Sequence, residues 1–200
     1  MSGQNVTTLG GIAQIMRQTL QSYGLNAEEM FTQVGLDAPD KISSEDRIQA
    51  VAMQKLWRLA EDSTGDQSFG IKYASNANPM VLHGLGFSWL ASDTLLNAFK
   101  RLVRYYRLIS TAGEIILEEQ QQSYMLWFKI PAPKGVAAPA SLDAALALFI
   151  QLCRFTKGNN FTPSVVDLHR VEPQDPTPFR EFFGCPVNFD SDGRFIRPKD

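Results

Sequence analysis

The stretch "SDTLLNAFKRLVRYYRLISTAGEIILEEQQQSYMLWFKI" (Ser92–Ile130) decides the fold class. Before Gly113, apolar residues recur every three or four positions, which is the pattern of an amphipathic helix. After Gly113, they alternate with other residues, as in strands that bury one face. The polar run Gln120–Gln122 separates two such alternating segments. We therefore expect a helix over residues 92–110 followed by two strands.

The chain before this stretch is predicted to be helical throughout. From the same apolar spacing, helices are expected at residues 7–23, 26–35, 43–65, 67–75 and 80–91. Asn26, Ser43 and Ser92 are the expected N-caps, because their short side chains can accept hydrogen bonds from unpaired backbone amides. Asp46 follows Ser43 by three residues and resembles the acidic member of a capping box.

The chain after this stretch returns to mixed helices and strands. A linker rich in Pro, Gly and Ala (131–140) leads to a helix (141–157), a strand (163–172), a short helix (176–184) and two last strands in "CPVNF" and "RFIRP". The expected order is β-β-α-β-α-β-β. We predict an α+β fold in which an N-terminal helical lobe (1–112) packs on a mostly antiparallel sheet of an α+β lobe (113–200), within a single domain.

The predicted helix 141–157 is apolar on nearly every side. Asp143, Gln151 and Arg154 form only a narrow polar stripe along it. A helix of this kind is buried on two sides. It is expected to lie between the sheet and either a further layer or a second subunit, and this second reading is the basis for expecting a homodimer.

The composition is that of a soluble globular protein. Of the 200 residues, 44% are apolar and 20% are charged, and the net charge is −2, which disfavours a nucleic-acid-binding surface. No apolar run approaches the roughly 18 residues that a membrane-spanning helix needs. The N-terminal residues lack the basic and apolar regions of a secretory signal. A cytoplasmic protein without membrane contact is expected.

No catalytic or metal-binding motif is present in the sequence, and no cofactor or metal is expected. Cys153 and Cys185 form neither a disulfide framework nor a zinc pattern. Cys185 follows the expected end of a helix at Gly184 and precedes Pro186, so it lacks a cationic neighbourhood that would make it reactive. We interpret it as an apolar plug before a final hairpin. An enzyme dependent on Cys185 or a histidine remains the alternative.

Six residues are candidates for contacts with a small molecule. His83 lies in an apolar segment, where it could be an interior or pocket-lining histidine or, alternatively, a haem ligand of a stand-alone haem- or lipid-binding module. Arg104 belongs to the run "KRLVRYYR", which is typical of a solvated helix end but could also receive an anion or, less readily, a nucleic acid. Aromatic residues with polar tips often line cavities, and one between the lobe and the sheet is the natural place. The candidates are His83, Trp89, Arg104, Tyr105, Tyr106 and Trp127.

Two segments carry a family resemblance. "HGLGFSWLASDTLLNAFKRLVRYYRLIS" with the strands after it, and "FREFFGCPVNF", resemble the N-terminal effector-binding (arabinose-binding-like) domain of AraC-family transcription regulators, over about residues 8–198. The resemblance implies a bacterial, cytoplasmic, dimeric sensor of a small-molecule effector, anionic or amphipathic, and no enzymatic activity.

The resemblance also implies a C-terminal helix-turn-helix domain that contacts DNA. That domain is absent from this chain, which ends at Asp200, where the linker to it is expected. We therefore expect an isolated sensing domain that reaches DNA only through the absent part. No ligand contact transfers residue by residue from the family.

Overall fold

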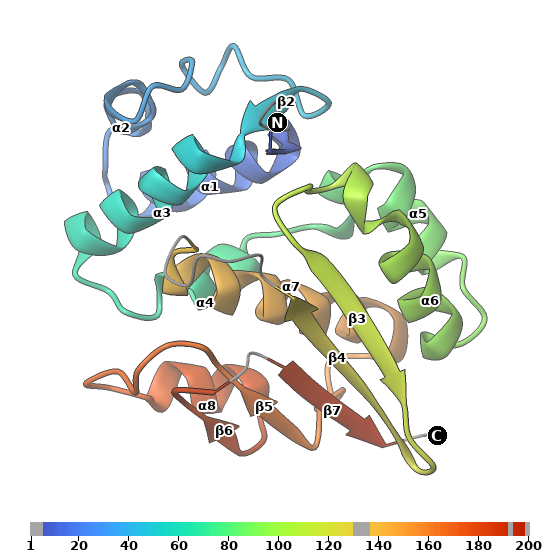
Figure 1. Cartoon of the computed structure of the whole chain (residues 1–200). Coiled ribbons are helices and arrows are strands. Elements are labelled where there is room, and N and C mark those ends of the chain that lie inside the picture. Colours follow the sequence, from blue (N-terminus) through green and yellow to red (C-terminus); the bar gives the residue numbers. More distant parts are fainter. Residues whose placement is uncertain (1–5, 130–136, 192–193, 199–200) are drawn as a thin grey trace, which may run out of the picture.

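The computed structural model describes residues 6–129, 137–191 and 194–198. The helices are α1 (Gly10–Ser22), α2 (Ala27–Gln33), α3 (Ala50–Thr64), α4 (Phe69–Ser75), α5 (Gly84–Leu90), α6 (Leu95–Tyr105), α7 (Pro139–Lys157) and α8 (Thr177–Phe183), with 3-10 turns η1 (Pro79–Leu82) and η2 (Tyr106–Leu108). The strands are β1 (Thr7–Leu9), β2 (Arg47–Gln49), β3 (Glu114–Glu119), β4 (Ser123–Lys129), β5 (Val165–Asp167), β6 (Val187–Asn188) and β7 (Arg194–Pro198). The α+β class is confirmed (Figure 1).

A five-stranded sheet forms in the order β3-β4-β7-β5-β6, with only the β5–β6 pair parallel. The alternation seen in the sequence is confirmed in β4, where Leu126 and Phe128 are buried, and Ile115 lies opposite Phe128 on β3. The predicted last hairpin is wrong. β5 lies between β6 and β7, because β7 pairs with both β4 and β5 instead of with its neighbour in sequence.

A two-stranded sheet, β1–β2, occupies segments that were expected to be helical. The helices predicted at 7–23 and 43–65 begin only at Gly10 and Ala50. The bond expected of the capping box exists, since the Ser43 amide donates to the Asp46 carboxylate over 2.7 Å, but it closes a turn that leads into β2. β1 is also held by the residue that follows η2, because the Leu9 amide donates to the Ile109 carbonyl over 2.8 Å.

Helix ends follow the sequence at some positions and differ at others. Asn26 caps α2 as expected, accepting from the Glu29 amide. The cap of α6 is Thr94 and not Ser92, whose hydroxyl donates instead to the carbonyl of Ser88. The helix predicted over 80–91 is divided into η1 and α5 at His83.

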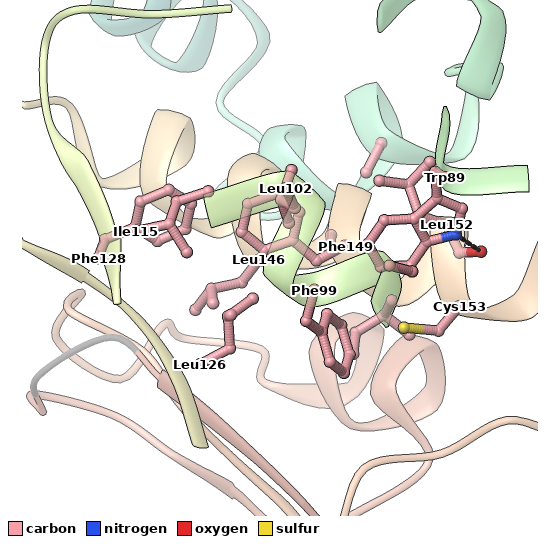
Figure 2. Packing of buried hydrophobic residues seen from close by; sticks show 14 of the residues in the cluster. Trp89, Phe99, Leu102, Ile115, Leu126, Phe128, Leu146, Phe149, Leu152 and Cys153 are labelled. Carbon is pink, nitrogen blue, oxygen red and sulfur yellow. Dashed lines mark hydrogen bonds between the residues drawn. The ribbon is translucent and has the colours of Figure 1, made fainter. Parts of the chain in front are cut away.

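Helix α7 is central to both hydrophobic cores of the chain (Figure 1). Its first half packs with α1–α4, and its second half packs with α5, α6, α8 and the sheet (Figure 2). Of the two positions predicted for it, the structure therefore has α7 between the sheet and a further layer of the same chain. Asp143, expected on a polar stripe, is fully buried, whereas Phe155 near its C-terminal end is 54% exposed. The expected linker residues 131–136 lie outside the described residues.

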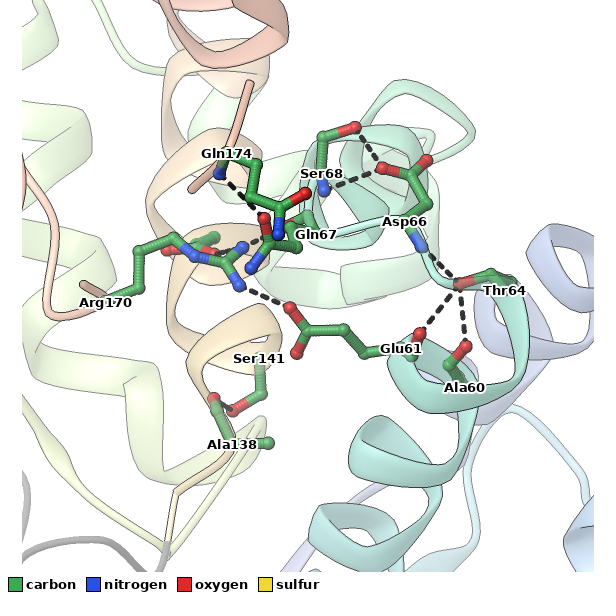
Figure 3. A network of polar contacts seen from close by, with 11 residues as sticks. Ala60, Glu61, Thr64, Asp66, Gln67, Ser68, Ala138, Ser141, Arg170 and Gln174 are labelled. Carbon is green, nitrogen blue, oxygen red and sulfur yellow. Dashed lines mark hydrogen bonds and ion pairs between the residues drawn. The ribbon is translucent and has the colours of Figure 1, made fainter. Parts of the chain in front are cut away.

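Arg170, which follows β5, makes a buried ionic cluster beside α7 (Figure 3). Its guanidinium donates to Asp143 over 2.9 Å, to the Glu61 carboxylate on α3, and to the Gln67 carbonyl that precedes α4. The same guanidinium lies 5.2 Å from the centroid of the Phe179 ring on α8. One cation thus joins α7, α8 and the end of α3 with the entry to α4, segments that span residues 61–179.

Two carboxylates share this single guanidinium. Burial raises the pKa of Asp143 to about 8, with the nearby Glu61 charge acting in the same direction and Arg170 opposing both. The second oxygen of Asp143 is buried and accepts no hydrogen bond from the described residues, which further disfavours the ionised form. The cluster is therefore closest to neutral when Asp143 carries a proton.

Substituting Gly70 with alanine should destabilise the protein. A Cβ at Gly70 would lie 2.3 Å from the Ala140 carbonyl oxygen, so α4 and α7 would have to separate. We expect a loss of about 2 kcal/mol in the free energy of unfolding, measured by urea titration. Lys72→Ala on the exposed side of α4 is the matched control and should change it by less than about 0.5 kcal/mol. Equal effects of the two changes would contradict the close approach at Gly70.

Asp143→Asn should change the pH dependence of stability. The folded-state pKa of Asp143 lies above the ordinary value of 3.8, so the folded protein binds a proton that the unfolded chain releases. The free energy of unfolding of the wild type, relative to Asp143→Asn, should therefore fall by about 2 kcal/mol or more as pH rises from 4 to 8. Urea titrations at several pH values measure this difference. A rise with pH would mean that Asp143 remains ionised beside Arg170.

Candidate functional site

Two cavities of different size are lined by candidate residues. The larger, about 520 Å³, is called here the α5 cavity, and it is lined by Leu9, Glu45, Leu82, His83, Gly84, Leu85, Ser88, Tyr105, Leu108 and Ile109. The smaller, about 130 Å³, is called here the interlobe cavity, and it lies between α3, α7 and the start of the hairpin. Small-molecule sites in proteins usually measure roughly 300–1,000 Å³. Of these two, the α5 cavity falls in this range and the interlobe cavity does not.

The wall of the α5 cavity is assembled from segments distant in sequence. β1 and the turn before β2 meet η1, α5 and η2 there. Arg47 fixes this meeting, because its guanidinium donates to the Leu108 carbonyl over 2.6 Å and to the side chain and carbonyl of Thr7 over 3.1 and 3.2 Å. The cavity therefore marks the place where the first residues of the fold join the α5–η2 segment.

His83 has two unusual features at the edge of this cavity. Its backbone adopts φ 48° and ψ −130°, a conformation that residues with a side chain rarely adopt. Its Nε2 is buried and has no hydrogen-bond partner among the described residues. Conformations of this kind cost roughly 1–3 kcal/mol and cluster at functional sites. His83 is thus a strained residue with unused hydrogen-bonding capacity.

The interlobe cavity is smaller and its polar groups are already engaged. The Tyr73 hydroxyl donates to the Ile12 carbonyl over 2.8 Å. Gln54 accepts from the Ala138 amide and from the Ser141 hydroxyl. Burial raises the pKa of Tyr106, which also lines this cavity, to about 12. The cavity has few free groups with which to orient a ligand.

The six candidate residues do not gather at one site. His83 and Tyr105 line the α5 cavity, and Tyr106 lines the interlobe cavity. Trp89 is 1% exposed; its Nε1 donates to the Leu152 carbonyl over 3.0 Å and its ring packs on Phe99, as Figure 2 shows. Trp89 is therefore part of the core.

Arg104 and Trp127 line neither of the two cavities. Arg104 is exposed, with its guanidinium 5.4 Å from the centroid of the Tyr105 ring. Trp127 is half-exposed on β4 and donates to Glu118 over 3.2 Å. Glu45 could not be predicted as a lining residue from local sequence, because the pairing of β2 with β1 brings it to the cavity.

Cys185 is the residue on which the alternative of an enzyme mainly rests. Burial raises the pKa of the half-buried Cys185 to about 11, so this thiol is protonated and unreactive near neutral pH. The described residues contain no group of three or more His, Cys, Asp and Glu side chains that could hold a metal ion. None of the helices among these residues has both the length and the apolar character needed to cross a membrane.

Comparisons with known proteins point to one family. Residues 24–198 match the family described as "Arabinose-binding domain of AraC transcription regulator, N-term". The crystal structure of the transcriptional regulator CdpR from Pseudomonas aeruginosa is similar, with a TM-score of 0.63 and 11% identity over 92% of this chain, which shows a shared fold. The chain spans 54% of the CdpR chain. No curated protein sequence matches significantly.

Replacing His83 with glycine should stabilise the protein. Glycine adopts the φ of His83 without strain, and the change also removes the unpaired Nε2. We expect the free energy of unfolding to rise by up to about 1 kcal/mol in a urea titration. Ser88→Gly, at an ordinary helical position of α5, is the control and should lower it by about 0.5–1 kcal/mol. Destabilisation by both changes would show that the backbone at His83 is not strained.

Proposed function

The chain belongs to the family of arabinose-binding N-terminal domains of AraC transcription regulators, and we propose from this that its effector is a small molecule bound in the α5 cavity. It is an effector-binding regulatory domain, and the family is not one of enzymes. The size of the α5 cavity is the observation that carries the proposal, because the interlobe cavity is too small for most effectors.

We propose His83 and Tyr105 as direct effector contacts, since both line the α5 cavity. Tyr106 lines the interlobe cavity instead, so we do not propose it as an effector contact in the α5 cavity. Trp89 supports the site from the core, through its packing with Phe99 behind α5. Arg104 and Trp127 are not among the residues that line the α5 cavity; Arg104 lies against the ring of Tyr105, and Trp127 donates to Glu118.

The proposed mechanism follows from the composition of the cavity wall. An effector that touches Leu9 or Glu45 and also Leu85 or Leu108 bridges segments that meet only in the folded state. It therefore stabilises the arrangement in which they are joined, and can shift the domain toward it by the difference in affinity between two arrangements. A helix-turn-helix segment of the full-length regulator, in the bacterial cytoplasm, would read this shift on DNA.

A homodimer remains part of the proposal, but α7 is a poor interface. Its apolar sides are covered by elements of its own chain, with Phe155 as the exposed exception. On α5, Phe87 and Leu90 are 60% and 44% exposed. This outer side of α5 is the better candidate for contact between two copies, and it would place the interface next to the effector cavity.

Blocking the α5 cavity should abolish effector retention. Gly84 is exposed and lines the cavity, and a Cβ there would meet no atom within 4 Å, so Gly84→Trp can enter the space without disturbing the core. Wild type and the matched control Gly84→Ala, incubated with a small-molecule extract of bacterial cells, should retain a molecule detectable by native mass spectrometry. Gly84→Trp should retain at least about 10-fold less, the effect of losing roughly 1.4 kcal/mol of binding.

Two results would count against this proposal. Equal retention by all three proteins would place the effector outside the α5 cavity. Retention by none of them, with folding verified by circular dichroism, would argue against a small-molecule effector in this domain.

A further inference from the structure

We propose that the α5 cavity selects a largely apolar molecule whose head group donates hydrogen bonds, a hydroxyl or an amine, and that it disfavours carboxylates. The inference rests on the proposed function of this cavity and narrows it. The sequence led us to expect an anionic or an amphipathic effector. The proposed selectivity favours an amphipathic effector over an anionic one.

The apolar part of the ligand follows from the aliphatic lining. Leu9, Leu82, Leu85, Leu108 and Ile109 supply half of the ten described residues that line the cavity. Such a surface gains from contact with hydrocarbon and offers no partner to a densely hydroxylated molecule, whose polar groups would lose water without replacement. The cavity thus favours a ligand that is mainly hydrocarbon.

The head group follows from the polar lining. Glu45 is the one charged residue among those described at the cavity wall, and its carboxylate only accepts hydrogen bonds. His83, Ser88 and Tyr105 can each accept as well. A donating head group therefore finds partners, whereas a carboxylate would meet Glu45 as a like charge.

No lysine or arginine among the described residues lines the cavity to offset that repulsion. Arg47 lies behind the wall, but its guanidinium is occupied by the Leu108 and Ile109 carbonyls and by Thr7. Arg104 lies against the ring of Tyr105 and is not part of the lining. An anionic ligand would thus lack the bidentate partner that proteins commonly provide for carboxylates.

His83 gives independent support for a polar contact at this wall. Its backbone is held at φ 48° and its Nε2 is buried without a partner among the described residues. Both features cost stability, and neither contributes to packing. A hydrogen bond between the imidazole and a ligand is a reason for a histidine to occupy this position.

Three probes with the same carbon chain test the inference: octan-1-ol, octylamine and octanoate. Their dissociation constants for the wild-type chain are measured by isothermal titration calorimetry at pH 7.5. Octan-1-ol and octylamine should each bind at least about 5-fold more tightly than octanoate, the ratio that one net hydrogen bond supplies. Binding of both should be lost in Gly84→Trp and kept in Gly84→Ala.

Two variants assign the selectivity to residues. Glu45→Gln keeps the shape of the side chain but removes its charge, so octanoate should bind about 2- to 5-fold more tightly and octylamine correspondingly more weakly, with octan-1-ol unchanged. His83→Phe keeps a ring but has no nitrogen, and should weaken octan-1-ol by about 5-fold.

The outcomes separate this inference from the proposed function. Octanoate binding as tightly as the other probes, an unchanged ranking in Glu45→Gln, or no binding of any probe to the wild type would each overturn the head-group selectivity. The proposed function would still stand if a molecule from cell extract were retained by the wild type and lost in Gly84→Trp. Probe binding that survives in Gly84→Trp would instead overturn the placement of the site.

Discussion

The buried guanidinium of Arg170 is the contact on which the arrangement of this domain depends. It joins α3 through Glu61, α7 through Asp143, the entry to α4 through the Gln67 carbonyl, and α8 through the ring of Phe179. A buried charge left without its partners is far more costly than a lost surface ion pair. The cluster therefore ties α3, α7, α8 and the entry to α4 to the residues that follow β5.

This arrangement of the helices allows α7 to pack in two hydrophobic cores. Gly70 brings the backbone of α4 against Ala140, so α7 lies close to the N-terminal helices on one side while its later turns pack under α5, α6 and the sheet. None of the described residues that line the α5 cavity is among the partners of Arg170, so the cavity wall is built from other segments than the ionic cluster. A sensing site is expected in such a region, where a bound molecule adds a large share of the local contacts.

The contrast between the packed core and the α5 cavity also explains where a strained backbone conformation is tolerated. His83 stands between η1 and α5, next to the cavity, and its backbone conformation can persist because Trp89 anchors the following turns in the core through Leu152. The rigid core thus supports a local arrangement that is unfavourable on its own. Cys185 has no comparable feature, because burial raises the pKa of its thiol to about 11.

The sequence by itself determined the elements whose signals are local. The helical spacing of α6, the alternation in β4, the cap at Asn26, the α+β class and the family resemblance could all be read from short segments. Only the tertiary structure decided the pairing of β1 with β2, the insertion of β7 between β4 and β5, the burial of Asp143 and the approach of Glu45 to His83 across the cavity. The reason is physical: periodicity along a chain records which side of an element is apolar. Strand partners, ion pairs and cavity walls depend on residues that are distant in sequence, from 27 positions apart for Arg170 and Asp143 to 109 for Arg170 and Glu61.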